Sequence, residues 1–147
     1  ILGFSDGGNL AIKFALTYPD YVDKLILNGA NVEMFNGIKP HFQLPIYAAY
    51  GLLAAAAHVS KKAGRRRDVF GLVVRQYGVA LDDLAQLTMP TLIIVGERDM
   101  VRDSQTREMA ARIPHCRVET FRDGDHFVAA KQPSRFNRTV IEFLLGR

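Results

Sequence analysis

The chain has 147 residues, of which 48% are hydrophobic and 23% are charged, and this composition predicts a single globular domain. The net charge is +4, and most of the excess positive charge lies at Lys61, Lys62 and residues 65–67. No nucleic-acid motif or interleaved aromatic residue accompanies this basic run. We therefore expect that it forms a solvated face and that the chain has no nucleic-acid partner. Cys116 is the only cysteine, which excludes an internal disulfide and favours a reducing, cytoplasmic compartment.

The first residues carry the most informative motif. Residues 3–7 read GFSDG, and G-x-S-x-G is the pattern of a nucleophile elbow, in which a strand turns sharply into a helix and presents the serine. We expect glycines two positions before and after Ser5 because side chains there would collide with the turn. The context agrees, since residues 1–2 are typical of a strand end and residues 9–18 predict a helix that Pro19 stops.

A long segment separates the next two predicted strands, at residues 25–27 and 91–96. We predict an inserted helical cap over residues 32–87, with a loop at 41–45, helices at 46–62, 69–77 and 81–87, and a break at Gly64. The apolar stretch within it is too short to span a bilayer, so we expect no membrane partner. Six residues of the segment could line a pocket, although core packing is the better interpretation for each: Met34, Phe35, Phe42, Tyr47, Tyr50 and Phe70.

The second half of the chain continues the alternation of strands and helices. Residues 91–96 form a continuous apolar run, which predicts a parallel strand covered on both faces. Asp99 follows its carboxyl end, where side chains that carry chemistry collect in α/β sheets. A helix at 103–112, a strand at 117–121, a turn holding His126 and a closing helix at 132–145 complete the pattern.

Ser5, Asp99 and His126 stand in the order Ser…Asp…His that is typical of α/β-hydrolases, and each follows a predicted strand. A serine nucleophile needs a base, and the base needs an orienting acid. We therefore predict that these three are catalytic, with the backbone N–H of Asp6 as one oxyanion donor. The alternative is a serine turn, a loop aspartate and a surface histidine that never meet.

These motifs resemble the C-terminal part of an α/β-hydrolase-fold domain. Residues 3–9, the helix that ends at Tyr18-Pro19, and residues 25–30 are especially similar to the biphenyl hydrolase-like or valacyclovir hydrolase-like branch, and residues 90–99 and 124–126 match the family's acid and histidine blocks. The resemblance implies that residues 1–147 are that part of the domain. It implies an α/β fold with about four parallel strands, the family's strands five to eight, with flanking helices and a cap. It also implies hydrolysis of carboxylic esters through an acyl-enzyme on Ser5.

The Asp6 side chain has two interpretations. Beside the nucleophile, it would favour substrates with a positive group near the ester, such as amino-acid esters, as the resemblance also implies. It could instead cap the helix that follows the elbow, which is the more conservative interpretation. No cysteine, histidine or acidic cluster has metal-ligand spacing and no nucleotide-binding motif is present, so we expect neither a metal nor a cofactor.

The expected partner is a small-molecule ester. The resemblance also implies that the first strand lies at an exposed apolar edge, because the family's neighbouring strand is absent, and such an edge favours self-association. Other functions remain open: acyl transfer or C–C bond hydrolysis by the same triad, or an inactive truncated fragment that self-associates. Inactivity is plausible because the second oxyanion donor would lie in the missing part.

Overall fold

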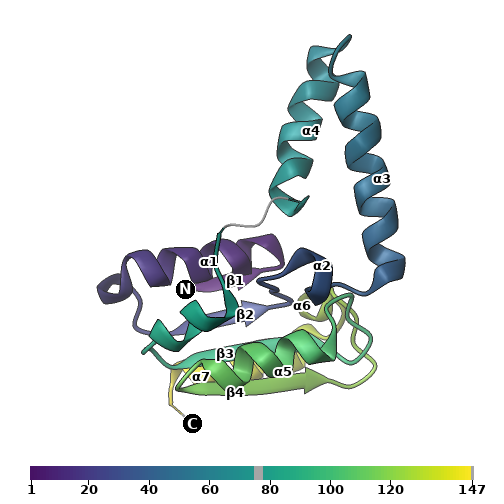
Figure 1. The fold of residues 1–147 in the computed structure, drawn as a ribbon. Helices are drawn as coiled ribbons and strands as arrows, with labels where there is room; N and C mark the ends of the chain where they lie inside the picture. Colours follow the sequence, from purple (N-terminus) through teal and green to yellow (C-terminus); the bar gives the residue numbers. More distant parts are fainter. Residues whose placement is uncertain (75–77, 147) are drawn as a thin grey trace.

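A computed structural model describes residues 1–74 and 78–146 of the chain (Figure 1). Its four-stranded sheet is parallel throughout and has the order β1-β2-β3-β4, so each strand lies beside its neighbour in sequence. The strands are β1 (Leu2–Phe4), β2 (Leu25–Asn28), β3 (Thr91–Gly96) and β4 (Cys116–Phe121). The predicted α/β class with about four parallel strands is confirmed.

Helices cover both faces of this sheet. One face packs against α1 (Asp6–Thr17), the 3-10 helix η2 (Leu81–Gln86) and α5 (Asp103–Arg112). The other packs against α6 (Val128–Lys131) and α7 (Pro133–Leu144). A short 3-10 turn, η1 (Pro19–Tyr21), follows α1, and α2 (Met34–Gly37) follows β2. The sequence predicted α5 with these bounds, but α6 was not expected, and α1 begins earlier than predicted because it starts at the elbow itself.

The two central strands, β2 and β3, are buried on both faces, as strands of a covered parallel sheet require. In β2, Leu25 and Leu27 belong to the core beneath α1 and α5, whereas Ile26 belongs to the core beneath α7. All six residues of β3 are buried. Burial of each such aliphatic side chain contributes about 1.5–3 kcal/mol relative to leaving it in water. This packing fixes the positions of the strand ends.

The segment between β2 and β3 differs most from the prediction. Two antiparallel helices, α3 (Pro40–Ala56) and α4 (Lys61–Val74), form a hairpin that projects away from the sheet (Figure 1). The loop predicted at residues 41–45 is wrong: Pro40 is the first residue of α3, and Pro45 lies within it. Proline is favoured at the first position of a helix, so Pro40 marks the start of α3. Pro45 disfavours a helix, but it does not end α3.

The predicted helix at 46–62 and its break at Gly64 are also wrong. The helix α3 ends at Ala56, and Lys61, Lys62 and Gly64 belong to α4. The hydroxyl of Ser60 accepts a hydrogen bond from the N–H of Ala63 at 3.3 Å, which is the contact of an N-terminal cap. The predicted helix at 69–77 is the end of α4, and residues 75–77 of that prediction lie outside the described residues.

The third helix predicted in this segment packs with the sheet rather than with the hairpin. Leu84 in η2 and Leu87 just after it are fully buried in the core beneath α1 and α5. Of the six residues for which core packing was expected, only Met34 is buried, and Phe35 is 71% exposed. The core expectation was therefore wrong for Phe35 on α2, and also for Phe42 and Tyr47 on α3, which are 37% and 38% exposed, because these side chains lie on the solvent-facing surfaces of their helices.

The strand β1 lies at one edge of the described sheet, as expected, and β4 lies at the other. Leu2 and Phe4 of β1 are 46% and 40% exposed, and Leu10 on the adjoining α1 is 55% exposed. An exposed apolar edge can pair with another chain. Among the described helices, none is long and apolar enough to cross a lipid bilayer.

Candidate active site

The sharp turn at Ser5 joins β1 to α1, as the elbow motif predicts. Ser5 has a φ of 51° and a ψ of −120°, a conformation that residues other than glycine rarely adopt. Its N–H donates to the carbonyl of Asn28 at 2.7 Å, which ties the turn to the end of β2. Such backbone strain costs on the order of 1–3 kcal/mol and is found at functional sites. The surrounding sheet holds the serine in this position.

The predicted collision with the turn is confirmed at the glycine before Ser5 and is wrong at the glycine after it. A Cβ on Gly3 would lie 2.4 Å from the carbonyl oxygen of Gly7, so the position before the turn has no room for a side chain. Gly7 itself has open space around its would-be Cβ, so the predicted collision at this position was wrong. The tight position is Gly8, where a Cβ would lie 2.7 Å from the Cβ of Ala30. There, α1 packs directly on the chain after β2.

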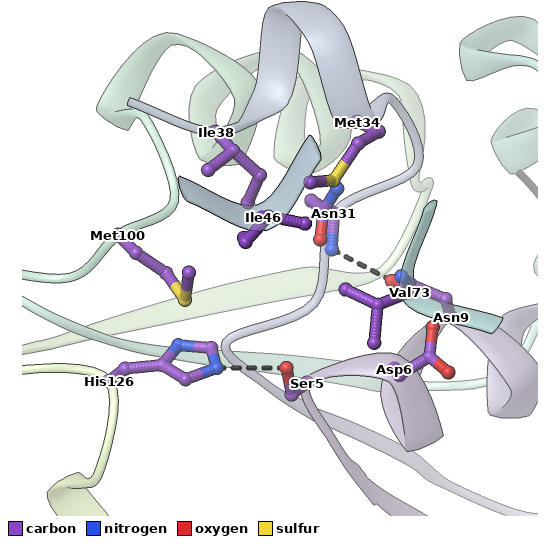
Figure 2. Close-up of a pocket in the computed structure, with 10 residues that line it drawn as sticks. All are labelled: Ser5, Asp6, Asn9, Asn31, Met34, Ile38, Ile46, Val73, Met100 and His126. Atoms are coloured by element: carbon purple, nitrogen blue, oxygen red, sulfur yellow. Dashed lines mark hydrogen bonds between the residues drawn. The ribbon is translucent and has the colours of Figure 1, made fainter. Parts of the chain in front are cut away.

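The structure brings Ser5, His126 and Asp99 together in one line of hydrogen bonds. The Oγ of Ser5 lies 2.8 Å from Nε2 of His126, a bond drawn in Figure 2. The Nδ1 of His126 lies 2.8 Å from Oδ1 of Asp99. With the proton on Nδ1 donated to the carboxylate, Nε2 is left to accept the serine proton. The three residues follow β1, β4 and β3, so their meeting depends on the order of the strands.

Asp99 is held as a charged carboxylate. It is only 1% exposed, and burial by itself would raise its pKa, but the hydrogen bond and charge attraction of His126 lower it. The backbone N–H groups of Val101 and Gly96 also donate to the carboxylate, at 3.1 and 3.3 Å. Together these contacts bring the pKa of Asp99 below its ordinary value of 3.8. At neutral pH the side chain therefore accepts hydrogen bonds and does not donate them.

Two residues around this line were missed by sequence reasoning. Gly29 follows β2 with a φ of 63° and lies against the imidazole of His126. The Asn-Gly pair after a buried strand was the available signal, since glycine accepts this left-handed conformation without strain. The ammonium group of Lys39 donates to the backbone carbonyl of Asp99 and fixes the loop after β3. A lone lysine at the start of a helix offered no comparable signal.

A small pocket opens beside Ser5 (Figure 2). Its polar lining residues include Asp6, Asn9 and Asn31, and the N–H of Asn31 donates to Oδ1 of Asn9 at 2.8 Å. Its apolar lining residues are Met34, Ile38, Ile46, Val73 and Met100. The pocket is small, with a volume of about 30 Å³, and is partly open to solvent. An acyl group therefore requires movement of these side chains, and the two methionines are the most adaptable.

Asp6 lies at the boundary of the pocket and the helix. It is the first residue of α1, and Ser5 occupies the N-cap position, so the carboxylate lies in the first helical turn rather than at the cap. A negative charge in that turn is favourable in the helix dipole. The same residue lines the pocket next to Ser5. Asp6 is therefore not the N-cap residue, and its placement is compatible with a favourable interaction with the helix dipole and with a role in the pocket.

The remaining histidines and the thiol lie outside the pocket. His41 and His58 belong to the hairpin segment, and His115 precedes β4. Cys116 is half-buried at the start of β4, and burial raises the pKa of its thiol to about 11, so it stays protonated at neutral pH. Within residues 1–74 and 78–146, no three His, Cys, Asp or Glu side chains are placed to hold a metal ion.

The chain is similar in sequence and in fold to several known hydrolases. Serine hydrolase BPHL of Mus musculus is 27% identical over 98% of this chain and 54% of its own length. A 2-hydroxy-6-oxononadienedioate/2-hydroxy-6-oxononatrienedioate hydrolase of Cupriavidus pinatubonensis is 27% identical over 98% of this chain and 61% of its own length. The meta-cleavage product hydrolase CumD of Pseudomonas fluorescens superimposes with a TM-score of 0.71 at 24% identity, covering 99% of this chain and 64% of that chain.

No protein-family model matches the chain. The chain spans between half and two thirds of the length of these relatives. The resemblance inferred from the motifs is confirmed, because these relatives and structural neighbours are α/β-hydrolases.

Proposed function

Because the chain belongs to the α/β-hydrolase superfamily, we propose that it is a serine hydrolase that cleaves carboxylic esters through an acyl-enzyme on Ser5. The observation that carries the proposal is the continuous line of 2.8 Å contacts from Ser5 Oγ through His126 to the buried Asp99. The strained backbone at Ser5 supports it, since such strain is found at functional sites.

Each step uses groups that the site already positions. His126 takes the hydroxyl proton as Ser5 Oγ attacks the acyl carbon, and the imidazolium then gives that proton to the departing alcohol. A water molecule then attacks the acyl-enzyme while His126 takes its proton, and His126 returns that proton to Ser5 Oγ as the carboxylic acid leaves. Asp99 keeps the proton of His126 on Nδ1 and stabilises the imidazolium. The backbone N–H of Asp6, next to the nucleophile, is the proposed oxyanion donor.

The pocket supports a finer proposal about the substrate. Among the described residues that line it, the ionisable side chains are Asp6 and His126, and none is a lysine or an arginine. A negative side chain beside the reacting ester favours a substrate with a positive group there, such as an amino-acid ester. The apolar lining residues, among them Ile46 and Val73, suit a small hydrophobic substituent. We therefore propose amine-bearing esters as the preferred substrate class.

One relative supports a second candidate function. The Cupriavidus relative is named for hydrolysis of dioate substrates, and the same triad could support C–C bond cleavage or acyl transfer here. A substrate with two carboxylates needs cationic side chains in the pocket, and none of the described lining residues is a lysine or an arginine. Ester hydrolysis is therefore the leading proposal. Product analysis with an amino-acid ester, with and without an added alcohol acceptor, distinguishes hydrolysis from transfer.

The first experiment is intact-mass analysis after exposure to a fluorophosphonate probe. A single adduct that is lost in Ser5→Ala is the expected result, because the probe reacts only with an activated serine. Circular dichroism of both proteins checks that they are folded. A folded chain that takes up no probe would instead favour the interpretation of an inactive fragment.

The exposed edge supports a proposal about association. We propose that two copies pair along β1, because Leu2, Phe4 and Leu10 give that edge an apolar border and a two-fold axis would cover it in both copies.

The free thiol of Cys116, the only cysteine, supports a reducing compartment. Cytoplasmic action on a small ester is the corresponding proposal.

A further inference from the structure

The hairpin of α3 and α4 presents apolar side chains to solvent along its length. Gln43 is the one buried residue of α3, and Gly71 is the one buried residue of α4. Leu52, Val59 and Val69 are 74%, 91% and 69% exposed. Figure 1 shows the two helices extending away from the sheet, in contact with each other. The described part of the chain therefore leaves this apolar surface without a cover.

The hairpin also holds the net charge of the chain. Residues 40–74 contain five lysines and arginines and one acidic residue, Asp68, which gives +4. The rest of the sequence has fourteen basic and fourteen acidic residues, because the totals are 19 and 15. The net charge of +4 thus lies on one projecting element, and the remainder is electrically balanced.

The cationic and apolar groups share one surface. A groove of about 670 Å³ runs between the two helices and is lined by Ala49, Leu52, Leu53, Arg65, Arg66, Val69 and Phe70. Arg65 and Arg66 are exposed, so their guanidinium groups can reach beyond the apolar lining. This arrangement matches the boundary of an anionic bilayer, where acyl chains lie directly beneath phosphate groups.

We propose that the α3–α4 hairpin binds the surface of an anionic lipid bilayer. Leu52 and Val69 enter the outer part of the acyl region, while Arg65 and Arg66 contact lipid phosphates. This departs from the expectation of no membrane partner, which considered only helices that cross a bilayer; surface binding requires an apolar face and cationic side chains, not a spanning length.

Charge complementarity favours a bilayer over other occupants. A second copy would bring another +4 hairpin against the first, so like charges oppose pairing through this groove. Nucleic acid would satisfy the arginines but leave the leucine and valine side chains in water. The base of the hairpin supplies Ile46 and Val73 to the pocket beside Ser5. Docking through the hairpin would therefore hold the active site close to the bilayer surface.

The test is flotation of the 147-residue chain with vesicles. Vesicles of phosphatidylcholine alone are compared with vesicles that also contain phosphatidylglycerol. The double variant Arg65→Gln/Arg66→Gln should lower the partition coefficient by about thirtyfold, since each cationic side chain at an anionic surface contributes roughly a factor of five. The matched control is Lys13→Gln/Arg138→Gln, which removes the same charge from exposed positions on α1 and α7.

The apolar contribution is tested by Leu52→Asp/Val69→Asp, which should also release the chain from anionic vesicles. Circular dichroism checks that each variant is folded. No flotation with either vesicle, equal flotation with both, or equal loss in the control pair would overturn the proposal. Sedimentation without lipid tests whether the groove binds a second copy of the chain. A dimer that is dissociated by Leu52→Asp/Val69→Asp would mean that it does, and would overturn the proposal.

Discussion

A Cβ atom on Gly29 would lie 2.7 Å from Cε1 and 2.9 Å from Nδ1 of His126. Glycine is thus the residue that lets the imidazole of His126 lie against the end of β2 while it bridges Ser5 and Asp99. The φ of 63° at Gly29 adds a second requirement, because L-residues are strained there.

Gly29→Ala should therefore displace the His126 ring and lower fluorophosphonate labelling of Ser5 by at least about a hundredfold, since small errors in catalytic geometry have effects of that order. The strained backbone should also lower the free energy of unfolding by about 1–2 kcal/mol. Gly51→Ala is the matched control, because its Cβ has open space in α3. Equal labelling of the two variants would show that Gly29 does not position the histidine.

Asp99→Asn tests the orienting acid. An amide can occupy nearly the same space, but it favours the wrong histidine tautomer, so the rate of ester hydrolysis should fall on the order of ten-thousandfold. The measurement is kcat on an activated ester, with Ser5→Ala as the baseline. A fall of less than about tenfold would mean that Asp99 does not orient His126 in the reaction.

Acid stability should depend on the same carboxylate. The folded-state pKa of Asp99 lies below 3.8, so the folded chain binds fewer protons there than the unfolded chain. Its contribution to stability is present above about pH 4 and is lost as the pH falls through the folded-state pKa. Urea unfolding of wild type and Asp99→Asn should show a difference in free energy that shrinks below about pH 4. A constant difference would contradict the pKa assignment.

Asp6→Ala separates the two interpretations of that side chain. If the carboxylate binds a substrate amine, kcat/KM should fall about five- to tenfold for an amino-acid ester and stay unchanged for its neutral analogue, as expected for one partly exposed ion pair. Thermal unfolding gives the helical contribution separately. Equal loss on both esters would mean that Asp6 serves the helix and the elbow alone.

Leu2→Lys tests pairing along β1. A lysine on an edge strand opposes strand addition, so self-association should weaken on the order of tenfold. Analytical ultracentrifugation measures the dissociation constant. Val118→Lys is the matched control, because Val118 lies on β4 at the opposite edge and is 38% exposed, close to the 46% of Leu2. If Val118→Lys has the larger effect, pairing uses the other edge.

The sheet and the triad could be predicted because strong local signals agree with the fold. The apolar run at residues 91–96 could form a buried strand, and a nucleophile motif, an acid and a histidine each followed such a strand. Parallel strands place their carboxyl ends at one edge, so strand order alone brings Ser5, Asp99 and His126 together. Tertiary packing reinforced every one of these signals.

The hairpin was predicted less well because local signals conflict there and little tertiary packing decides between them. Pro45 and Gly64 disfavour helix, yet both lie inside helices. Pro40 and the Ser60 cap set the helix starts instead, and these signals were overlooked. Gly29 could not be assigned to the site from sequence, since its role depends on a histidine 97 positions later in the chain.

The contact between Ser5 and His126 also has a consequence for folding. It joins residues 121 positions apart, so it closes almost the whole chain into one loop. Contacts of such long range are slow to form, because the entropy of loop closure is offset only once the intervening strands have docked. Ser5 therefore becomes nucleophilic only when folding is complete. In partly folded forms, in which β1 or β4 has not docked, Ser5 and His126 are not in contact and the serine is not activated.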